Sequence, residues 1–287
     1  MLTINPQEVP QPQLHAYLLG AVGPRPIAFA STIDKEGRVN LSPFSFFNIF
    51  SSKPPIAIFS PNRAGRTGAT KHTHDNVKEV PEVVLNIVNY DMVQQMSLSS
   101  SPYAKGVDEF VKAGFNKLPS QLVKPPRVAE APVTLECKVN QVIEMGEHGG
   151  AGNLIVCEVV LMHIKEEVLD EKGMIDQKKI DLVARMGGNW YCRAHGDALF
   201  EIPKPLTTLG IGIDQIPAGI RNSPVLTGNN LGQLGSVEHL PTAGEVEAWK
   251  AEHPVKFGSE AELHRYAQSL LDVNKVAEAW KVLLANP

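Results

Sequence analysis

Two long segments in which apolar and polar residues alternate, 133–144 and 153–164, constrain the fold of this chain most strongly. Such alternation is typical of strands with one buried face. The residues between them, 145–152, are rich in glycine, so we expect the two segments to pair as an antiparallel hairpin. The same alternation places Cys137 and Cys157 on the buried face, which predicts a packing role for both thiols and no redox role.

Shorter elements surround this hairpin. Because hairpin turns and short helices separate the strands, with no regular strand–helix–strand rhythm, the pattern favours an antiparallel barrel, mainly β with some α, over a Rossmann sheet. The glycine-rich stretches 210–212 and 228–235 contain no GxGxxG on a strand-to-helix turn, which argues against a dinucleotide-binding fold. The expected strands are 27–33, 39–41, 56–60 and 83–88, and the expected helices are 11–19, 91–98, 108–113 and 179–184.

Residues 42–50 combine four phenylalanines with serine, asparagine and proline. Pro43 has no N–H for a sheet ladder, so we expect an irregular loop here, closed by Pro54-Pro55. Aromatic side chains bordering a flat ring, with Ser42, Ser45 and backbone amides at its polar edge, would suit a partly polar ring system. The alternative interpretation is a loop whose phenylalanines fill a core.

A polar, basic segment, 61–76, follows the next strand. We expect Thr73 to cap a helix that begins at His74. A helix N-terminus preceded by Arg66 and Lys71 offers the N–H donors and positive charge that a phosphate monoester needs. A solvated surface loop is the alternative.

Two histidines and an aspartate in this segment, His72, His74 and Asp75, raise the question of a metal site. A lone His-x-His in a capping region lacks an obvious third ligand, so we expect no metal there.

The composition changes after residue 202, which predicts a domain over 1–202 and a loop-rich, helical C-terminal extension over 203–287. Thr242 and Ser259 each begin a capping box ahead of a helix. We expect the extension to pack on the barrel or on a partner subunit.

Net charge of −4 and a pI of about 6.1 argue against a nucleic-acid or membrane-surface partner. Three widely spaced cysteines without a CxxC pair fit reduced thiols, and the polar N-terminus carries no signal peptide. These features predict a cytoplasmic protein.

Four motifs, by their order and spacing, resemble those of a known family: residues 24–32, 42–48, 66–76 and 187–193. Over roughly residues 10–200 the chain resembles the flavin reductase-like family, the FMN-binding split barrels that include flavoredoxin and monooxygenase reductase components. The resemblance implies that 42–48 hold the isoalloxazine ring. It does not cover the C-terminal extension.

Further roles follow from the resemblance. Arg25 and Thr32 would lie near the ribityl chain, and a glycine pair with a tyrosine would lie near the flavin, often at a dimer contact. Here Gly187, Gly188, Tyr191 and Arg193 match that pattern, although a glycine turn before a core Trp-Tyr pair is the alternative. The implied cofactor-binding set is Arg25, Thr32, Asn40, Leu41, Ser42, Pro43, Phe44, Ser45, Phe47, Asn48, Arg66, Lys71, Thr73, Asn76, Gly188 and Tyr191.

The function implied is an FMN-dependent oxidoreductase that passes hydride from NAD(P)H to flavin, with NAD(P)H bound only transiently. The sequence offers no convincing nucleophile–base pair, which hydride transfer does not need. A homodimer and a monooxygenase or other electron acceptor are the expected partners. Two alternatives remain: an FMN-binding electron carrier without NAD(P)H activity, and a binding scaffold that has lost its flavin.

Overall fold

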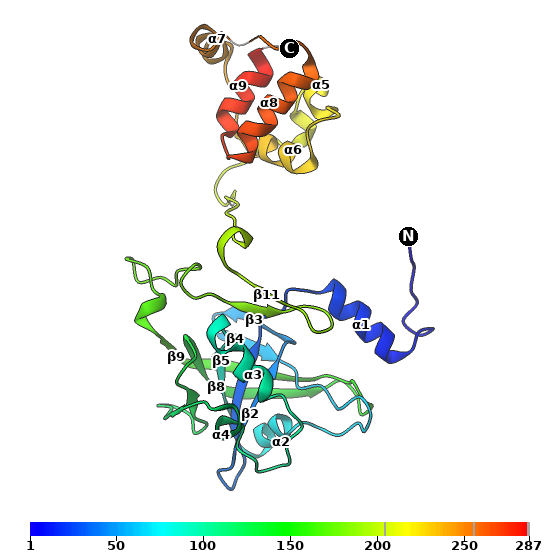
Figure 1. Ribbon diagram of the computed structural model, residues 1–287, viewed down its shortest axis with the longest axis vertical. Coiled ribbons are helices and arrows are strands. Elements are labelled where there is room, and N and C mark those ends of the chain that lie inside the picture. Colours follow the sequence, from blue (N-terminus) through cyan, green and yellow to red (C-terminus); the bar gives the residue numbers. More distant parts are fainter. Residues whose placement is uncertain (204, 255, 286–287) are drawn as a thin grey trace. The chain divides into compact units, whose positions relative to one another are not determined.

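The computed structural model describes residues 1–203, 205–254 and 256–285. The chain divides into two compact units, the first being Met1–Phe200 and the second beginning at Glu201 (Figure 1). We describe each unit by itself. Among the described residues, no helix has the length and apolar character needed to cross a bilayer.

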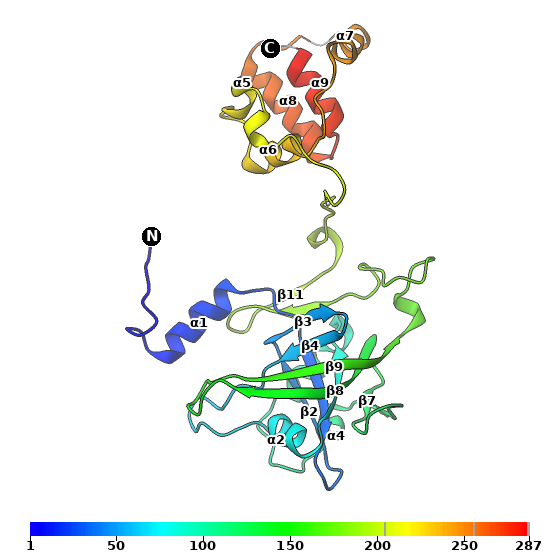
Figure 2. The same ribbon diagram turned by 180° about the vertical axis from the view of Figure 1, so that it is seen from behind.

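A seven-stranded antiparallel sheet forms the first unit, in the order β2-β1-β5-β8-β9-β4-β3 (Figures 1 and 2). Its two edge strands are nearly consecutive in sequence, because only Ser45 and Phe46 separate β2 from β3. This link spans at most about 11 Å, so the sheet must curl until its edges approach. The strands are β1 (Ala28–Ile33), β2 (Val39–Phe44), β3 (Phe47–Ser52), β4 (Pro55–Phe59), β5 (Glu82–Ile87), β8 (Val133–Glu144) and β9 (Asn153–Ile164).

No ladder joins β2 to β3 in the described part of the chain, so the barrel is open along that seam. The predicted antiparallel split barrel is confirmed. The predicted long hairpin is also present, since β8 and β9 pair along their whole length with two register shifts.

The barrel interior is a dense apolar core that includes Cys137 and Cys157. Both thiols are fully buried, and the Cys157 Sγ donates to the Ala57 carbonyl at 3.3 Å. The hydrogen bond with Cys157 and burial together raise the pKa of Cys137. The described structure therefore keeps these thiols in the core, as the alternation predicts.

The predicted irregular loop after Leu41 is wrong. Strand β2 runs through Pro43, which pairs with Phe29 of β1. The N–H of Leu41 donates to Glu109 Oε2 at 2.9 Å, which shows that this N–H points to the free edge of β2. Pro43 lies two residues further along the same edge strand, so its missing N–H costs no bond to β1.

Most of the predicted phenylalanine loop is likewise a strand. Residues 47–52 form β3, which pairs with β4 and contains a register shift between Ile49 and Ser51. The loop is thus reduced to the two-residue link Ser45-Phe46.

Short helices and strands complete this unit. A second apolar cluster, which includes Phe29, Leu41 and Phe110, packs α3 and α4 on the outer side of β1 and β2. The Asp108 side chain caps α4 by accepting from Phe110 N, and Gly114 ends it with a φ of 73°. The elements are α1 (Gln11–Ala21), α2 (His72–Glu79), η1 (Tyr90–Met92), α3 (Val93–Leu98), α4 (Glu109–Ala113), β6 (Lys117–Leu118), β7 (Arg127–Val128), η2 (Glu166–Val168), β10 (Val183–Arg185), β11 (Tyr191–Arg193) and η3 (Gly196–Ala198).

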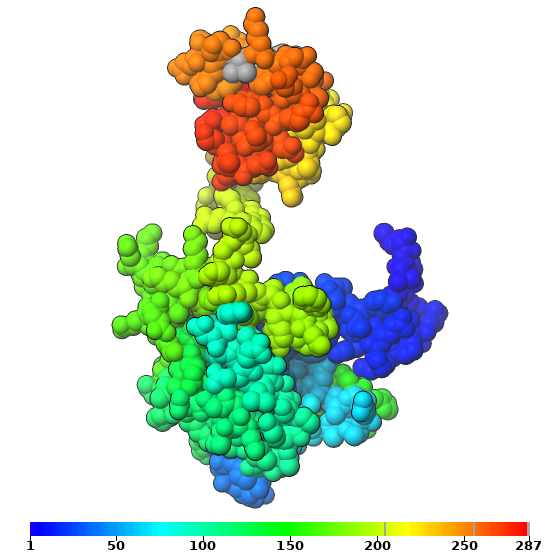
Figure 3. All heavy atoms as spheres, viewed as in Figure 1, coloured from blue at the N-terminus to red at the C-terminus, as the bar shows by residue number. Residues whose placement is uncertain are grey.

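The predicted helix over 179–184 is wrong, because this stretch is a turn that leads into the hairpin β10–β11. The turn of that hairpin lies against the end of α1, and the two segments are neighbours on the surface in Figure 3. A Cβ at Gly187 would lie only 3.0 Å from the Cα of Gly20, so glycine permits this close approach.

The second unit is helical around a core that includes Leu234, Leu271 and Trp280. The predicted capping box at Thr242 is confirmed, and Ser259 caps the next helix through Glu262 N. Residues 203–241, predicted as loop-rich, also contain α5 and α6; Thr227 and Asn230 form the capping box of α6. The elements are η4 (Ile213–Gln215), α5 (Ala218–Arg221), α6 (Gly228–Gly235), α7 (Ala243–Glu252), α8 (Glu260–Asp272) and α9 (Val276–Ala285).

Candidate functional site

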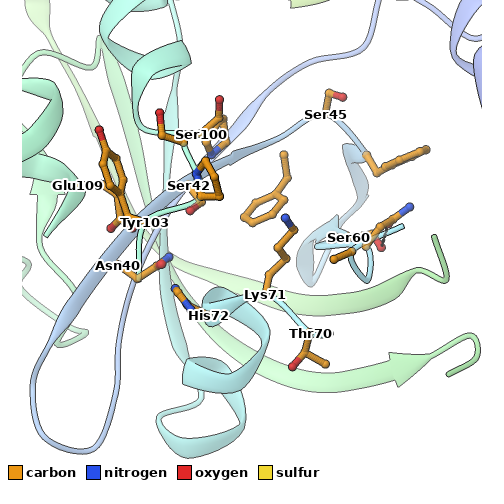
Figure 4. A pocket seen from close by; sticks show the side chains of 17 residues that line it. Asn40, Ser42, Ser45, Ser60, Thr70, Lys71, His72, Ser100, Tyr103 and Glu109 are labelled. Atoms are coloured by element: carbon orange, nitrogen blue, oxygen red, sulfur yellow. Dashed lines mark hydrogen bonds between the residues drawn. The ribbon is translucent and has the colours of Figure 1, made fainter. Parts of the chain in front are cut away.

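A cavity of about 430 Å³ opens beside the end of β2 (Figure 4). Its walls come from four segments of the first unit: residues within 40–46, 60–64 and 70–72, and residues within 100–109. Serine, asparagine and threonine side chains share these walls with Pro43, Phe44 and Phe46. The cavity therefore offers both hydrogen-bonding groups and apolar surfaces.

The start of α2 supplies the positive charge of the cavity. Lys71, Thr70 and His72 line it, and Figure 4 shows Lys71 reaching into the space between Ser42 and Ser60. Lys71 is the N-cap residue, and in the described part of the chain no side-chain hydrogen bond caps this helix start. Uncapped N–H donors beside a lysine form a site suited to a phosphate group.

Thr73 does not cap α2, because the helix begins at His72, two residues before the predicted start, and Thr73 lies within it. Its Oγ1 accepts from Asn40 Nδ2 at 2.9 Å, and Asn76 Nδ2 donates to Thr32 Oγ1 at 3.1 Å. All four side chains are buried, and among them Asn40 lines the cavity. These two bonds fix α2 against β1 and β2 and so position Lys71.

Arg66 is exposed and does not line the cavity. The segment around it is held instead by Arg63, which donates to the carbonyls of Gly146 and Gly68, each at 3.1 Å. Gly149 of the β8–β9 turn packs directly on Gly65, leaving no room for a Cβ. The segment is therefore a structured loop attached to the β8–β9 hairpin.

His74 is buried, with its ring nitrogens 3.2 Å from Asp75 Oδ1 and 3.2 Å from Glu144 Oε1. These contacts join α2 to the end of β8. Within the described ranges, no group of three His, Cys, Asp or Glu side chains is arranged to hold a metal ion.

A second cavity of about 480 Å³ adjoins the first, and both are lined by Ser45, Phe46, Ser60 and Asn62. The ring-binding residues expected from the resemblance are divided between the two. Ser42, Pro43 and Phe44 line the first cavity, whereas Arg25, Phe47 and Asn48 line the second.

The side chain of Arg25 is hydrogen-bonded to backbone carbonyl groups. Its guanidinium donates to the carbonyls of Leu19 and Met186, at 2.7 and 2.8 Å. Burial, together with Arg185, lowers the pKa of Arg25. Arg25 thus ties α1 and the β10–β11 turn to the barrel, beside the second cavity.

Gly188 and Tyr191 line neither of these two cavities. Gly188 is exposed in the β10–β11 turn with a φ of 56°. Tyr191 lines a third cavity, of about 190 Å³, and its ring lies under the Arg185 guanidinium at 4.6 Å. Arg193, which matches the family pattern in this turn region, pairs with Asp181 at 2.6 Å.

Several lining residues are absent from the expected set. Ser60 Oγ donates to Asn62 Oδ1 at 2.9 Å, and the Ser-Pro-Asn sequence after a strand is a signal for a loop. Glu109 and the stretch 100–103 reach the cavity because the chain between α3 and α4 crosses the edge of β2. No local sequence motif predicts that these residues line the cavity.

Known proteins resemble the first unit in sequence and structure. Residues 21–181 match the flavin reductase like domain. An uncharacterised protein of Aquifex aeolicus is 34% identical over 190 residues, covering 66% of this chain and 94% of that protein.

Two solved structures have the same fold. Nitrilotriacetate monooxygenase component B from Bacillus cereus is 30% identical with a TM-score of 0.66, covering 70% of this chain and 98% of its own. The 2-nitrobenzoate 2-nitroreductase NbaA of Pseudomonas fluorescens is 28% identical with a TM-score of 0.63, covering 73% of this chain and 100% of its own. With a domain match over more than half of its length, this chain belongs to the flavin reductase-like family.

Proposed function

We propose that this protein binds FMN in the two adjoining cavities and passes hydride from NAD(P)H to the flavin. The observation that carries the proposal is the first cavity, in which Lys71 and the uncapped start of α2 face the end of β2. Membership of the family makes flavin chemistry the general function, and both similar structures are named for oxidoreductases.

The chemistry of the lining groups fits FMN. A phosphate monoester carries about −1.5 to −2 charges, which Lys71 and the helix N-terminus would stabilise. The free edge of β2 leaves backbone groups near Pro43 without a strand partner, and these would bind the polar edge of the ring. Phe44 and Phe46 would border its faces. We assign the phosphate to Lys71 and His72 rather than to Arg66, Thr73 and Asn76.

When bound, FMN supplies the hydride-accepting chemistry, and the protein supplies position and electrostatics. This division of roles needs no nucleophile–base pair. It also needs no Rossmann site, because a nicotinamide stacked on an open flavin face at about 3–3.5 Å is already positioned to react.

Anaerobic stopped-flow of the FMN-loaded protein with NADH and with NADPH tests this proposal. We expect either nucleotide to bleach the absorbance band of oxidised flavin. Bleaching by dithionite but by neither nucleotide would replace the hydride-transfer proposal with the electron-carrier alternative. A protein that FMN cannot reconstitute would support the scaffold alternative.

A homodimer is part of the proposal. Trp190 is 78% exposed in the β10–β11 turn, and Phe50 is 64% exposed on the edge strand β3. Large apolar side chains exposed on an edge strand and a turn suit an interface better than solvent. Sedimentation equilibrium should give twice the mass of one chain, and a concentration-independent single-chain mass would contradict this.

The proposal includes a cellular setting and an electron acceptor. Three free cysteines favour a reducing, cytoplasmic setting. Similarity to a monooxygenase component B supports an oxygenase component as the electron acceptor.

A further inference from the structure

Glu109 differs from the other buried acids of the barrel. Asp34, Glu109 and Glu136 are each at most 3% exposed. Asp34 pairs with Arg38 at 2.7 Å, and Glu136 pairs with His163 at 2.7 Å. No ion pair reaches Glu109 in the part of the chain that the structure describes, and its Oε2 accepts the Leu41 N–H.

The pKa values of the three acids shift in directions that match this difference in partners. Burial alone would raise the pKa of Asp34, but hydrogen bonds from Arg38 and the backbone lower it overall. Burial would likewise raise the pKa of Glu136, but backbone hydrogen bonds and His163 lower it overall. For Glu109, burial raises the pKa above its ordinary value and the Leu41 N–H offsets only part of the effect. A carboxyl that lines a cavity and whose raised pKa is only partly offset is a candidate functional group.

The position of Glu109 limits what it can bind. It lines the first cavity on the Ser42 and Tyr103 side, and Figure 4 shows it across the cavity from Lys71. A phosphate there would be repelled by the carboxylate, whereas a neutral O–H or N–H would donate a hydrogen bond to it.

On the basis of the proposed function, we propose that the Glu109 carboxylate positions the flavin by accepting a hydrogen bond from a ribityl hydroxyl or from the ring imide N–H. Lys71 then attracts the phosphate at one end of the cavity, and Glu109 selects a neutral donor at the other. The acid is a positioning residue, and it acts on riboflavin and on FMN alike because both carry these donors.

This assignment predicts a pH dependence. Only the ionised carboxylate is a pure acceptor, so protonation of Glu109 in the free protein should weaken binding. The sign follows from the raised pKa: affinity is full above that pKa and falls as the pH drops through it, by up to about tenfold per pH unit. The other titratable side chains that line the cavity are Tyr103, Lys71 and His72, and Asp108 precedes Glu109 as the N-cap residue of α4.

The experiment measures riboflavin affinity by fluorescence quenching across the acidic to neutral range. Riboflavin is the probe because FMN carries a phosphate that titrates near pH 6. We expect Glu109→Gln to bind riboflavin about tenfold or more weakly at neutral pH and to lose most of the pH dependence. The amide oxygen can still accept the Leu41 N–H, so the fold should survive.

Two control variants distinguish a specific effect of Glu109 on flavin binding from the general effect of removing a buried acid. Glu136→Gln alters an equally buried acid outside the cavity and should lower stability while keeping the pH profile of riboflavin affinity. Asp34→Asn alters the other buried acid of the barrel, which also lies outside the first cavity, and should keep that profile too. A Glu109→Gln protein with wild-type affinity and pH profile would overturn the inference, as would a wild-type affinity that rises in acid.

The outcomes also separate this inference from the proposed function. If FMN binds in a Lys71-dependent manner while Glu109→Gln changes nothing, only the role of Glu109 fails. If neither FMN nor riboflavin binds the wild-type protein, the proposed function itself fails.

Discussion

Replacement of Lys71 by alanine should weaken FMN binding by about ten- to a hundredfold, because a charge-assisted hydrogen bond contributes about 1.5–3 kcal/mol. Riboflavin has no phosphate, so its affinity should change little. Lys71 reaches into the cavity from the start of α2, where the uncapped N–H groups would contact the same phosphate. Isothermal titration of both flavins against the folded variant measures the two losses.

Lys78→Ala is the control for this measurement. Lys78 lies in the last turn of the same helix, pairs with Glu144 at 2.9 Å and does not line the cavity. It should leave both affinities unchanged. If Lys71→Ala weakens riboflavin as much as FMN, Lys71 does not bind the phosphate.

Trp280→Ala should destabilise the second unit by about 3–5 kcal/mol, a large part of the 5–15 kcal/mol typical of a domain. Trp280 is fully buried, and its Nε1 donates to the Leu234 carbonyl at 3.0 Å. Truncation would leave a cavity and an unpaired carbonyl in the core of this unit. Differential scanning calorimetry of the full chain should show one transition lowered and the other unmoved.

The same variant tests whether 1–202 and 203–287 are independent domains, which remains a prediction. FMN affinity of Trp280→Ala should match wild type at a temperature where the barrel is folded. Trp249→Ala, which alters a partly buried tryptophan of the same unit, should cost much less. A single transition that moves as a whole, with flavin affinity lost, would show that the two units fold as one.

Alternation in the sequence predicted the two long strands well, and buried and half-buried residues alternate at the start of β9, over 153–157. In β8 the first five residues are all buried, so its burial does not follow the same period. Pro43 misled the prediction because its cost depends on whether β2 lies at the edge of the sheet, which is a tertiary property. The helix predicted over 179–184 failed for a related reason. A helix this short has too little stability of its own to compete with the tertiary pairing of this segment with β11.

The site was partly predictable. Lys71 could be selected because it precedes a predicted helix N-terminus, and Ser42 because the resemblance places 42–48 at the flavin ring. Thr73 and Asn76 looked like ligands in the sequence, yet they hold α2 through buried hydrogen bonds, which sequence cannot distinguish from binding. Glu109 could not be selected, since only the packing of α4 on β2 brings it to the cavity.

The most direct test of the central claim is a parallel titration of the full chain with FMN and with FAD, followed by quenching of flavin fluorescence. The phosphate monoester of FMN matches the lysine and helix start of the cavity, whereas FAD presents a bridging diphosphate with less charge per phosphorus and an adenosine that the cavity must also admit. We expect saturable binding of both flavins, with FMN clearly the tighter ligand. Equal affinities, a preference for FAD, or no saturable binding of FMN would contradict it.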